Sequence, residues 1–152
     1  MTGRARFDDS GETLLEVLVA VAVMSIAAVG IIGTIVTSIL LSSTHRSATN
    51  SSVAVHTYAE AIEKYVGVAG NYVDCATTSS YTPAAVGYVA PANVTVLAYS
   101  IQYWTGSAWG SCTSPDSGVQ RLTLSIRSSD TRASESISVV IRKPCAVGSS
   151  CS

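Results

Sequence analysis

The chain has 152 residues, a length that accommodates about one domain. Its formal net charge is −1 and its nine lysines and arginines are scattered, so it lacks the basic patch of a nucleic-acid-binding protein, and we predict no nucleic-acid partner. The run Leu14–Leu41 contains one charged residue, Glu16, and no proline. Roughly a hundred residues remain for a small core, which is marginal without additional covalent stabilisation.

The apolar run predicts a membrane anchor. A helix needs about 20 apolar residues to cross a bilayer, whereas the apolar part of a cleaved secretory signal has about 7–15. Residues 12–41 are therefore predicted to form a single transmembrane helix that stays attached to the protein. Arg4 and Arg6 precede the run and favour a cytoplasmic N-terminus. The expected location is the cytoplasmic membrane, with the C-terminal domain on the extracytoplasmic side.

The helical pattern continues beyond the membrane segment. Over residues 42–67 apolar side chains recur every three to four positions, at Val55, Tyr58, Ile62 and Tyr65 or Val66. Gly67 and Gly70 then supply a stop signal. The sequence predicts one helix that is apolar all round in its first half and amphipathic in its second half.

The remaining residues, 68–152, predict a small antiparallel sheet. Residues 71–93 contain two prolines among many small residues and are expected to be irregular. Three segments alternate apolar and polar residues, as strands with one buried face do: 94–104, 119–127 and 136–142. A hairpin turn is expected at 128–134 and a longer loop at 105–118. The predicted fold class is α+β, with the helix packed on the sheet.

Four cysteines lie after the apolar run, at Cys75, Cys112, Cys145 and Cys151. An even number on one side of a membrane, in a small domain, predicts disulfides formed in an oxidising compartment. The alternative is a structural zinc site, but the spacings fit no paired C-x2-C knuckle and both histidines lie far upstream. We therefore expect disulfides and no metal. Four cysteines allow three pairings, among which this reasoning does not choose.

The residues Gly11-Glu12-Thr13-Leu14-Leu15-Glu16, followed by a long apolar helix, resemble the prepilin signature of type IV pilins and pseudopilins. The resemblance implies that residues 1–11 are a leader, cut between Gly11 and Glu12 by a prepilin peptidase, and that Glu12 is the candidate for N-methylation. It also implies that Glu16 neutralises the N-terminal amine of a neighbouring subunit. A carboxylate in hydrocarbon is costly unless it is paired, which agrees with this role. The alternative for Glu16 is a chance acid that reaches the head groups from a helix end.

The sequence departs from the family pattern at several positions. Glu12 stands where the family usually has Phe or Met, and Asp8 and Asp9 lie where a basic residue is common. Gly33 occupies the place of a helix-breaking proline in many major pilins, with Gly30 one turn earlier. These two glycines predict either helix flexibility or close helix packing in the membrane.

The resemblance extends more weakly to the C-terminal domain. Residues 116–143 are similar to the last strands of actinobacterial pilin-like proteins. In that setting the implied disulfides join Cys75 to Cys112 and Cys145 to Cys151.

The sequence contains no catalytic constellation, so we expect neither an enzyme nor a cofactor. His45 and His56 lie about 16 Å apart along a helix, which is too far for them to share a metal ion. Trp104 and Trp109 flank a short loop segment and form either a binding edge or a small anchoring core.

The expected function is structural. The chain is expected to be a minor pilin or pseudopilin of a type IV pilus or type II secretion-like filament, assembled through its N-terminal helix and displayed at the cell surface. Its expected partners are the prepilin peptidase, other pilin or pseudopilin subunits in a homo- or hetero-polymer, the membrane and, indirectly, an assembly platform protein and an ATPase. The alternative is a single-pass anchored surface domain that binds a ligand and never polymerises.

Overall fold

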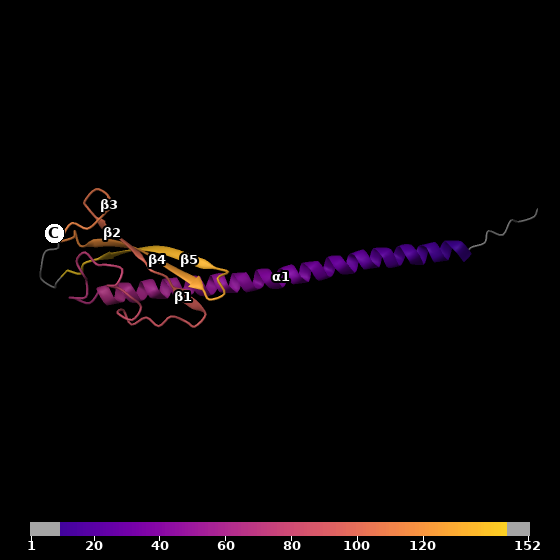
Figure 1. The fold of residues 1–152 in the computed structure, drawn as a ribbon, viewed down its shortest axis with the longest axis horizontal. Coiled ribbons are helices and arrows are strands. Elements are labelled where there is room, and N and C mark those ends of the chain that lie inside the picture. The colour runs from indigo at the N-terminus through magenta and orange to yellow at the C-terminus, as the bar shows by residue number, and fades with distance from the viewer. Residues whose placement is uncertain (1–9, 146–152) are drawn as a thin grey trace, which may run out of the picture. The chain divides into compact units, whose positions relative to one another are not determined.

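A computed structural model describes residues 10–145 of the chain. The chain divides into two compact units, one ending at Ser43 and the other beginning at Thr44, and a single helix, α1 (Ser10–Val66), belongs to both (Figure 1). The described part of the first unit is helical throughout. The second unit packs the end of α1 against a small antiparallel sheet, so the predicted α+β class is confirmed.

Helix α1 ends at the predicted stop signal. The Gly67 amide still donates to the Glu63 carbonyl, at 2.9 Å, and the chain then leaves the helix. Gly70 has a φ of 95°, which glycine adopts without the strain that a Cβ would cause. The Asn71 side-chain amide donates to the Tyr65 carbonyl at 3.0 Å, so one of the last helical carbonyls has a partner.

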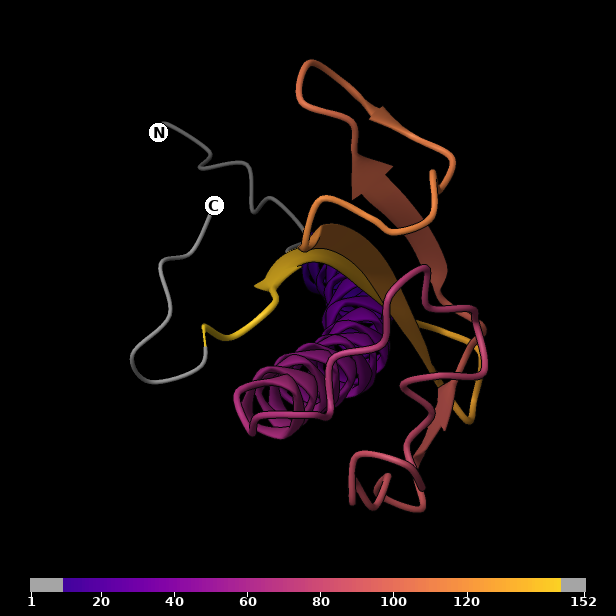
Figure 2. The same cartoon turned by 90° about the vertical axis from the view of Figure 1, so that its left-hand side faces the viewer.

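The sheet has five strands, which are β1 (Val94–Val96), β2 (Ser100–Trp104), β3 (Trp109–Gly110), β4 (Val119–Ser128) and β5 (Ser134–Arg142). All pairs are antiparallel, and β4 is the central strand. β5 pairs with one side of β4, β1 and β2 both pair with β4, and β3 pairs with β2. Seen along α1, the sheet arches over the end of the helix (Figure 2).

The core lies between the sheet and the predicted apolar stripe of α1. The helix residues Val55, Tyr58, Ile62 and Val66 are buried, and Tyr65 packs beside them. β4 contributes three fully buried apolar side chains, Leu122, Leu124 and Ile126, from one face, as the alternation predicts. On β5, Ile141 is buried, and Ile137 and Val139 pack against the same core.

The predicted strand 94–104 is interrupted by a bulge, so the prediction of one continuous strand was wrong. Val96 lies opposite Ile126, whereas Ser100, four residues later, lies opposite Thr123, three residues earlier. The segment from Val96 to Ser100 therefore carries one extra residue relative to β4, which defines a β-bulge between β1 and β2.

The bulge reverses which side chains face the core. Val94 and Val96 point inward before it, whereas Tyr99 and Ile101 point inward after it. Apolar residues stand at both odd and even positions of this segment, so simple alternation did not reveal the extra residue. The two-residue strand β3, inside the loop expected at 105–118, was also not predicted.

Residues 71–93 have neither helix nor strand, as expected, but they are not a surface linker. Tyr72, Tyr81 and Tyr88 from this segment are buried in the core. The segment lies against α1 and the sheet through side chains that the composition did not identify as core residues.

Tyrosine hydroxyls hold the backbone of this irregular segment. Tyr58 of α1 donates to the Tyr81 carbonyl at 2.6 Å, and Tyr99 of the sheet segment accepts from the Tyr81 amide at 2.7 Å. The Tyr81 hydroxyl in turn accepts from the Val73 amide at 3.0 Å. Burial, followed by the neighbouring tyrosines Tyr99 and Tyr88, raises the pKa of Tyr58, so its hydroxyl remains a donor at ordinary pH.

We expect Leu124→Ala to lower the free energy of unfolding of the sheet domain by about 3 kcal/mol, because it opens a cavity in a fully buried position. Thr123→Ala, one residue away on the opposite face, is the matched control and should cost less than about 1 kcal/mol. Both tryptophans lie in the sheet domain, so their fluorescence during denaturant unfolding of the full chain in detergent micelles measures the difference. Equal losses in the two variants would contradict the assignment of the core face.

Candidate functional site

The first candidate site is the apolar surface of α1 between Thr13 and Ser42. Every side chain in this range is exposed. Leu14, Met24 and Val29, for example, are 71%, 76% and 72% exposed. A surface this apolar is stable only against lipid or other apolar side chains. By length and composition α1 is able to cross a membrane.

Three hydroxyl groups within this surface, those of Ser25, Thr34 and Thr37, are paired inside the helix. Ser25 donates to the Val21 carbonyl at 2.7 Å, and Thr37 donates to the Gly33 carbonyl at 2.9 Å. Such bonds to preceding carbonyls let hydroxyl side chains enter hydrocarbon without an unsatisfied donor. These polar side chains therefore do not oppose membrane insertion.

Glu16 cannot be accommodated in the same way because it carries a charge. No lysine, arginine or histidine occurs between residues 7 and 44. A cationic partner for this carboxylate must therefore come from the N-terminal region or from another molecule. Gly11 and Glu12, the predicted cleavage residues, lie in the first turn of α1.

Gly30 and Gly33 have no packing role inside this chain. A Cβ built at either position meets no atom within 4 Å beyond its own helix surroundings. The absence of a side chain thus matters only for contact with another helix or for the flexibility of α1. Both interpretations of these glycines are compatible with the structure.

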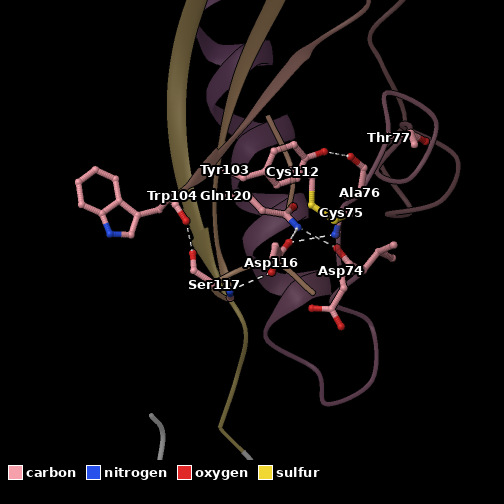
Figure 3. Close-up of a disulfide and its surroundings, with 12 residues drawn as sticks. Asp74, Cys75, Ala76, Thr77, Tyr103, Trp104, Cys112, Asp116, Ser117 and Gln120 are labelled. Atoms are coloured by element: carbon pink, nitrogen blue, oxygen red, sulfur yellow. Dashed lines mark hydrogen bonds between the residues drawn. A yellow bond between two sulfur atoms is a disulfide. The ribbon is translucent and has the colours of Figure 1, made fainter. Parts of the chain in front are cut away.

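The second candidate site is a polar cluster around Asp116 in the sheet domain (Figure 3). Its carboxylate accepts hydrogen bonds from the Cys75 amide at 3.0 Å, the Gly118 amide at 2.8 Å and the Gln120 side-chain amide at 2.6 Å. The Tyr72 hydroxyl donates to the same carboxylate, at 3.0 and 3.1 Å. One side chain thus joins the start of the irregular segment to the loop before β4.

These hydrogen bonds determine the ionisation of Asp116. Burial by itself raises the pKa of a carboxyl group, but donation from Gln120, Cys75, Gly118 and Tyr72 outweighs it and holds the pKa below its ordinary value. Burial and the bond to Asp116 raise the pKa of Tyr72, which therefore stays a donor. The cluster has the properties of a structural clasp, in which every donor points at one carboxylate.

A disulfide lies beside this clasp and reinforces the same connection. Cys75 and Cys112 are bonded, with Cα atoms 5.6 Å apart and a sequence separation of 37 residues, so the predicted pairing is confirmed. Closing a loop of this size stabilises a fold by about 3–4 kcal/mol in the chain-entropy description. The second implied pair, Cys145 with Cys151, includes a residue that lies outside the described part of the chain.

Sequence reasoning did not identify Asp116, Tyr72 or Gln120. Gln120 has a usable signal, because it occupies an inward position of β4 by simple alternation and is fully buried. Its side-chain amide donates to the Val73 carbonyl at 2.8 Å as well as to Asp116. The Asp-x-Gly sequence at 116–118 is a second signal, since aspartate commonly accepts from the amide two residues on.

The remaining candidate residues lie elsewhere on the domain. His45 and His56 are exposed on α1, and the described residues contain no group of three histidine, cysteine or acidic side chains able to hold a metal ion. Trp104 and Trp109 are outside the core and contact each other edge to face, with ring centroids 5.4 Å apart.

No protein-family model, no curated protein and no solved structure matches this chain. The architecture, a long apolar N-terminal helix followed by a small sheet domain, is compatible with that of pilin-like proteins.

We expect Asp116→Asn to lower the stability of the sheet domain by about 2 kcal/mol at pH 7, because hydrogen bonds to a charged acceptor are lost. A carboxyl group whose pKa is lowered by folding contributes fully above its unfolded pKa of about 4, and the contribution is lost as the pH falls through the folded-state pKa. The difference between variant and wild type should therefore shrink below about pH 4.

Asp74→Asn is the matched control for this change. Asp74 forms an exposed ion pair with Lys143 at 3.0 Å, which contributes less than about 1 kcal/mol. Unfolding curves of the full chain at a series of pH values test both variants. A constant difference between Asp116→Asn and wild type across the acid range would contradict the proposed role of the carboxylate.

Proposed function

We propose that this chain is a structural subunit of a type IV pilus or type II secretion-like filament, in the manner of a minor pilin or pseudopilin. The observation that carries the proposal is the combination at the start of α1. A carboxylate, Glu16, is the single charged residue in the exposed apolar part of α1, residues 13–42, and lies five residues after Gly11 of a prepilin-like motif. An apolar helix surface with one fixed charge suits association with other such helices, because the charge is tolerated only when a partner neutralises it.

In this proposal, a prepilin peptidase cuts between Gly11 and Glu12, and the new N-terminal amine of one subunit pairs with Glu16 of its neighbour. The apolar part of α1 first anchors the subunit in the cytoplasmic membrane and then packs in the filament core. The disulfide-bonded sheet domain faces outward. The assembly platform and its ATPase act on the subunit.

The experiment that tests this proposal is mass spectrometry of the N-terminal peptide of the membrane-extracted protein. A chain that begins at Glu12, with or without an added methyl group, would support processing by a prepilin peptidase. A chain that retains residues up to Gly11, in cells whose other prepilins are cut, would exclude the filament proposal. It would leave the chain as a single-pass anchored surface domain.

We expect Glu16→Gln to be cut normally but to be at least about tenfold depleted from sheared filaments, because an unpaired amine is then left in the apolar core. Glu60→Gln removes a carboxylate from the exposed part of α1 in the sheet domain and is the matched control. It should enter filaments at the wild-type level. Immunoblots of sheared and membrane fractions give the comparison, and normal incorporation of Glu16→Gln would refute the pairing role.

A further inference from the structure

The solvent side of the sheet, here called the outer face, carries charged side chains of one sign. It consists of the strand side chains that alternate with the core-facing ones. Its charged residues are Arg121, Arg127 and Arg142, and no aspartate or glutamate lies on the outer face of the described strands. The whole chain has more acidic than basic residues, so this face concentrates positive potential that the composition conceals.

Two of these arginines have no acidic partner among the residues that the structure describes. Arg127 and Arg142 are exposed, and neither lies within ion-pair distance of a carboxylate in the described part of the chain. They belong to neighbouring strands, β4 and β5. Exposed, unpaired guanidinium groups are available to bind carboxylates or phosphates.

Both tryptophans of the chain lie on the same outer face. Trp104 of β2 is paired with Trp109 of β3 across the sheet, and the Arg121 guanidinium lies 4.6 Å from the Trp109 ring centre. Arg121 also donates from Nε to the Gln102 side-chain oxygen at 3.1 Å, which fixes its orientation. The Trp104 indole points away from the core-side residue Gln120 (Figure 3).

Hydroxyl groups line much of the rest of the outer face, which also includes Val119 and Val140. The hydroxyls belong to Thr95, Ser100, Thr123, Ser125, Ser134, Ser136 and Ser138. Two cross-strand pairs bond to each other, Thr123 with Ser138 at 3.2 Å and Ser125 with Ser136 at 3.1 Å. Arg121 and Arg127 are six residues apart on β4, or about 20 Å along the strand. The face is therefore suited to an extended ligand.

We propose that the outer face binds an acidic polysaccharide, a chain of sugar rings that carries carboxylate groups. The arginines pair with the carboxylates, and the C–H face of a sugar ring packs on an indole, whose ring face is electronegative. The serine and threonine hydroxyls match the hydroxyls of the sugar. A nucleic acid fits less well, because base stacking needs open ring faces and Arg121 covers one face of Trp109. This proposal does not depend on filament formation.

The test uses the full chain in uncharged detergent micelles and polygalacturonate as the probe, with neutral dextran for comparison. We expect polygalacturonate to bind at low salt and dextran not to bind. Arg127→Glu with Arg142→Glu should weaken binding about tenfold, and about 0.5 M salt should abolish it. Trp104→Ala should weaken it about fivefold.

Arg46→Glu with Lys64→Glu makes the same change in net charge on the exposed side of α1 and is the matched control. It should keep binding within about twofold. The proposal is overturned if polygalacturonate does not bind, or if the two double variants bind equally well. It is also overturned if single-stranded DNA binds more tightly than polygalacturonate, or if the outer-face arginines instead control self-association measured by light scattering. Unchanged tryptophan fluorescence in the arginine variants shows that they are folded.

Discussion

The buried stripe of α1 is the surface on which the sheet domain is assembled. Val55, Tyr58 and Ile62 have almost no exposed area, and the apolar face of β4 lies against the same core. The sheet has a single apolar face and needs one layer to cover it, which this short stretch of helix supplies. A domain of this size buries a limited apolar area, so the helix must fit the sheet closely.

Only part of the core is built from regular elements. The irregular segment after α1 contributes buried tyrosines but has no helix or strand, so its backbone groups pair in turns and with side chains. Hydroxyls of Tyr58 and Tyr99 bond the backbone of Tyr81, and the Tyr81 hydroxyl accepts from the Val73 amide. The Asp116 carboxylate accepts from the Cys75 amide nearby, and the Cys75–Cys112 bridge joins the same residue covalently to the loop before β4. Because these groups are buried and mutually dependent, the segment is part of the fold and not a replaceable loop.

Two exposed surfaces of the described residues have different physical characters. The surface of α1 from Thr13 to Ser42 is apolar apart from Glu16 and a few internally bonded hydroxyls, and it requires lipid or other helices around it. The outer face of the sheet is largely polar and cationic, and its Arg127 and Arg142 are exposed to water. The proposed assembly function at one surface and the proposed recognition function at the other therefore use different residues.

Local patterns in the sequence determined the elements of this protein. The apolar run, the helical spacing from Val55 to Val66 and the alternation along β4 each depend on residues close together in the chain, so the order of amino acids is enough to reveal them. The candidate assembly residues Gly11, Glu12 and Glu16 are likewise a local motif. The choice of Cys75 with Cys112 came from a family resemblance, because spacing alone left three pairings open.

Tertiary structure decided what depends on residues far apart in the chain. The bulge between β1 and β2 exists because the two segments keep different registers against the same strand, and register is a property of the pair. The Asp116 clasp draws donors from residues 72 to 120, and no local pattern marks them as partners. The positive charge of the outer face also depends on tertiary structure. Arg127 and Arg142 lie on the same face, at opposite ends of the β4–β5 pairing, because its register aligns alternate side chains of the two strands, which the net charge does not reveal.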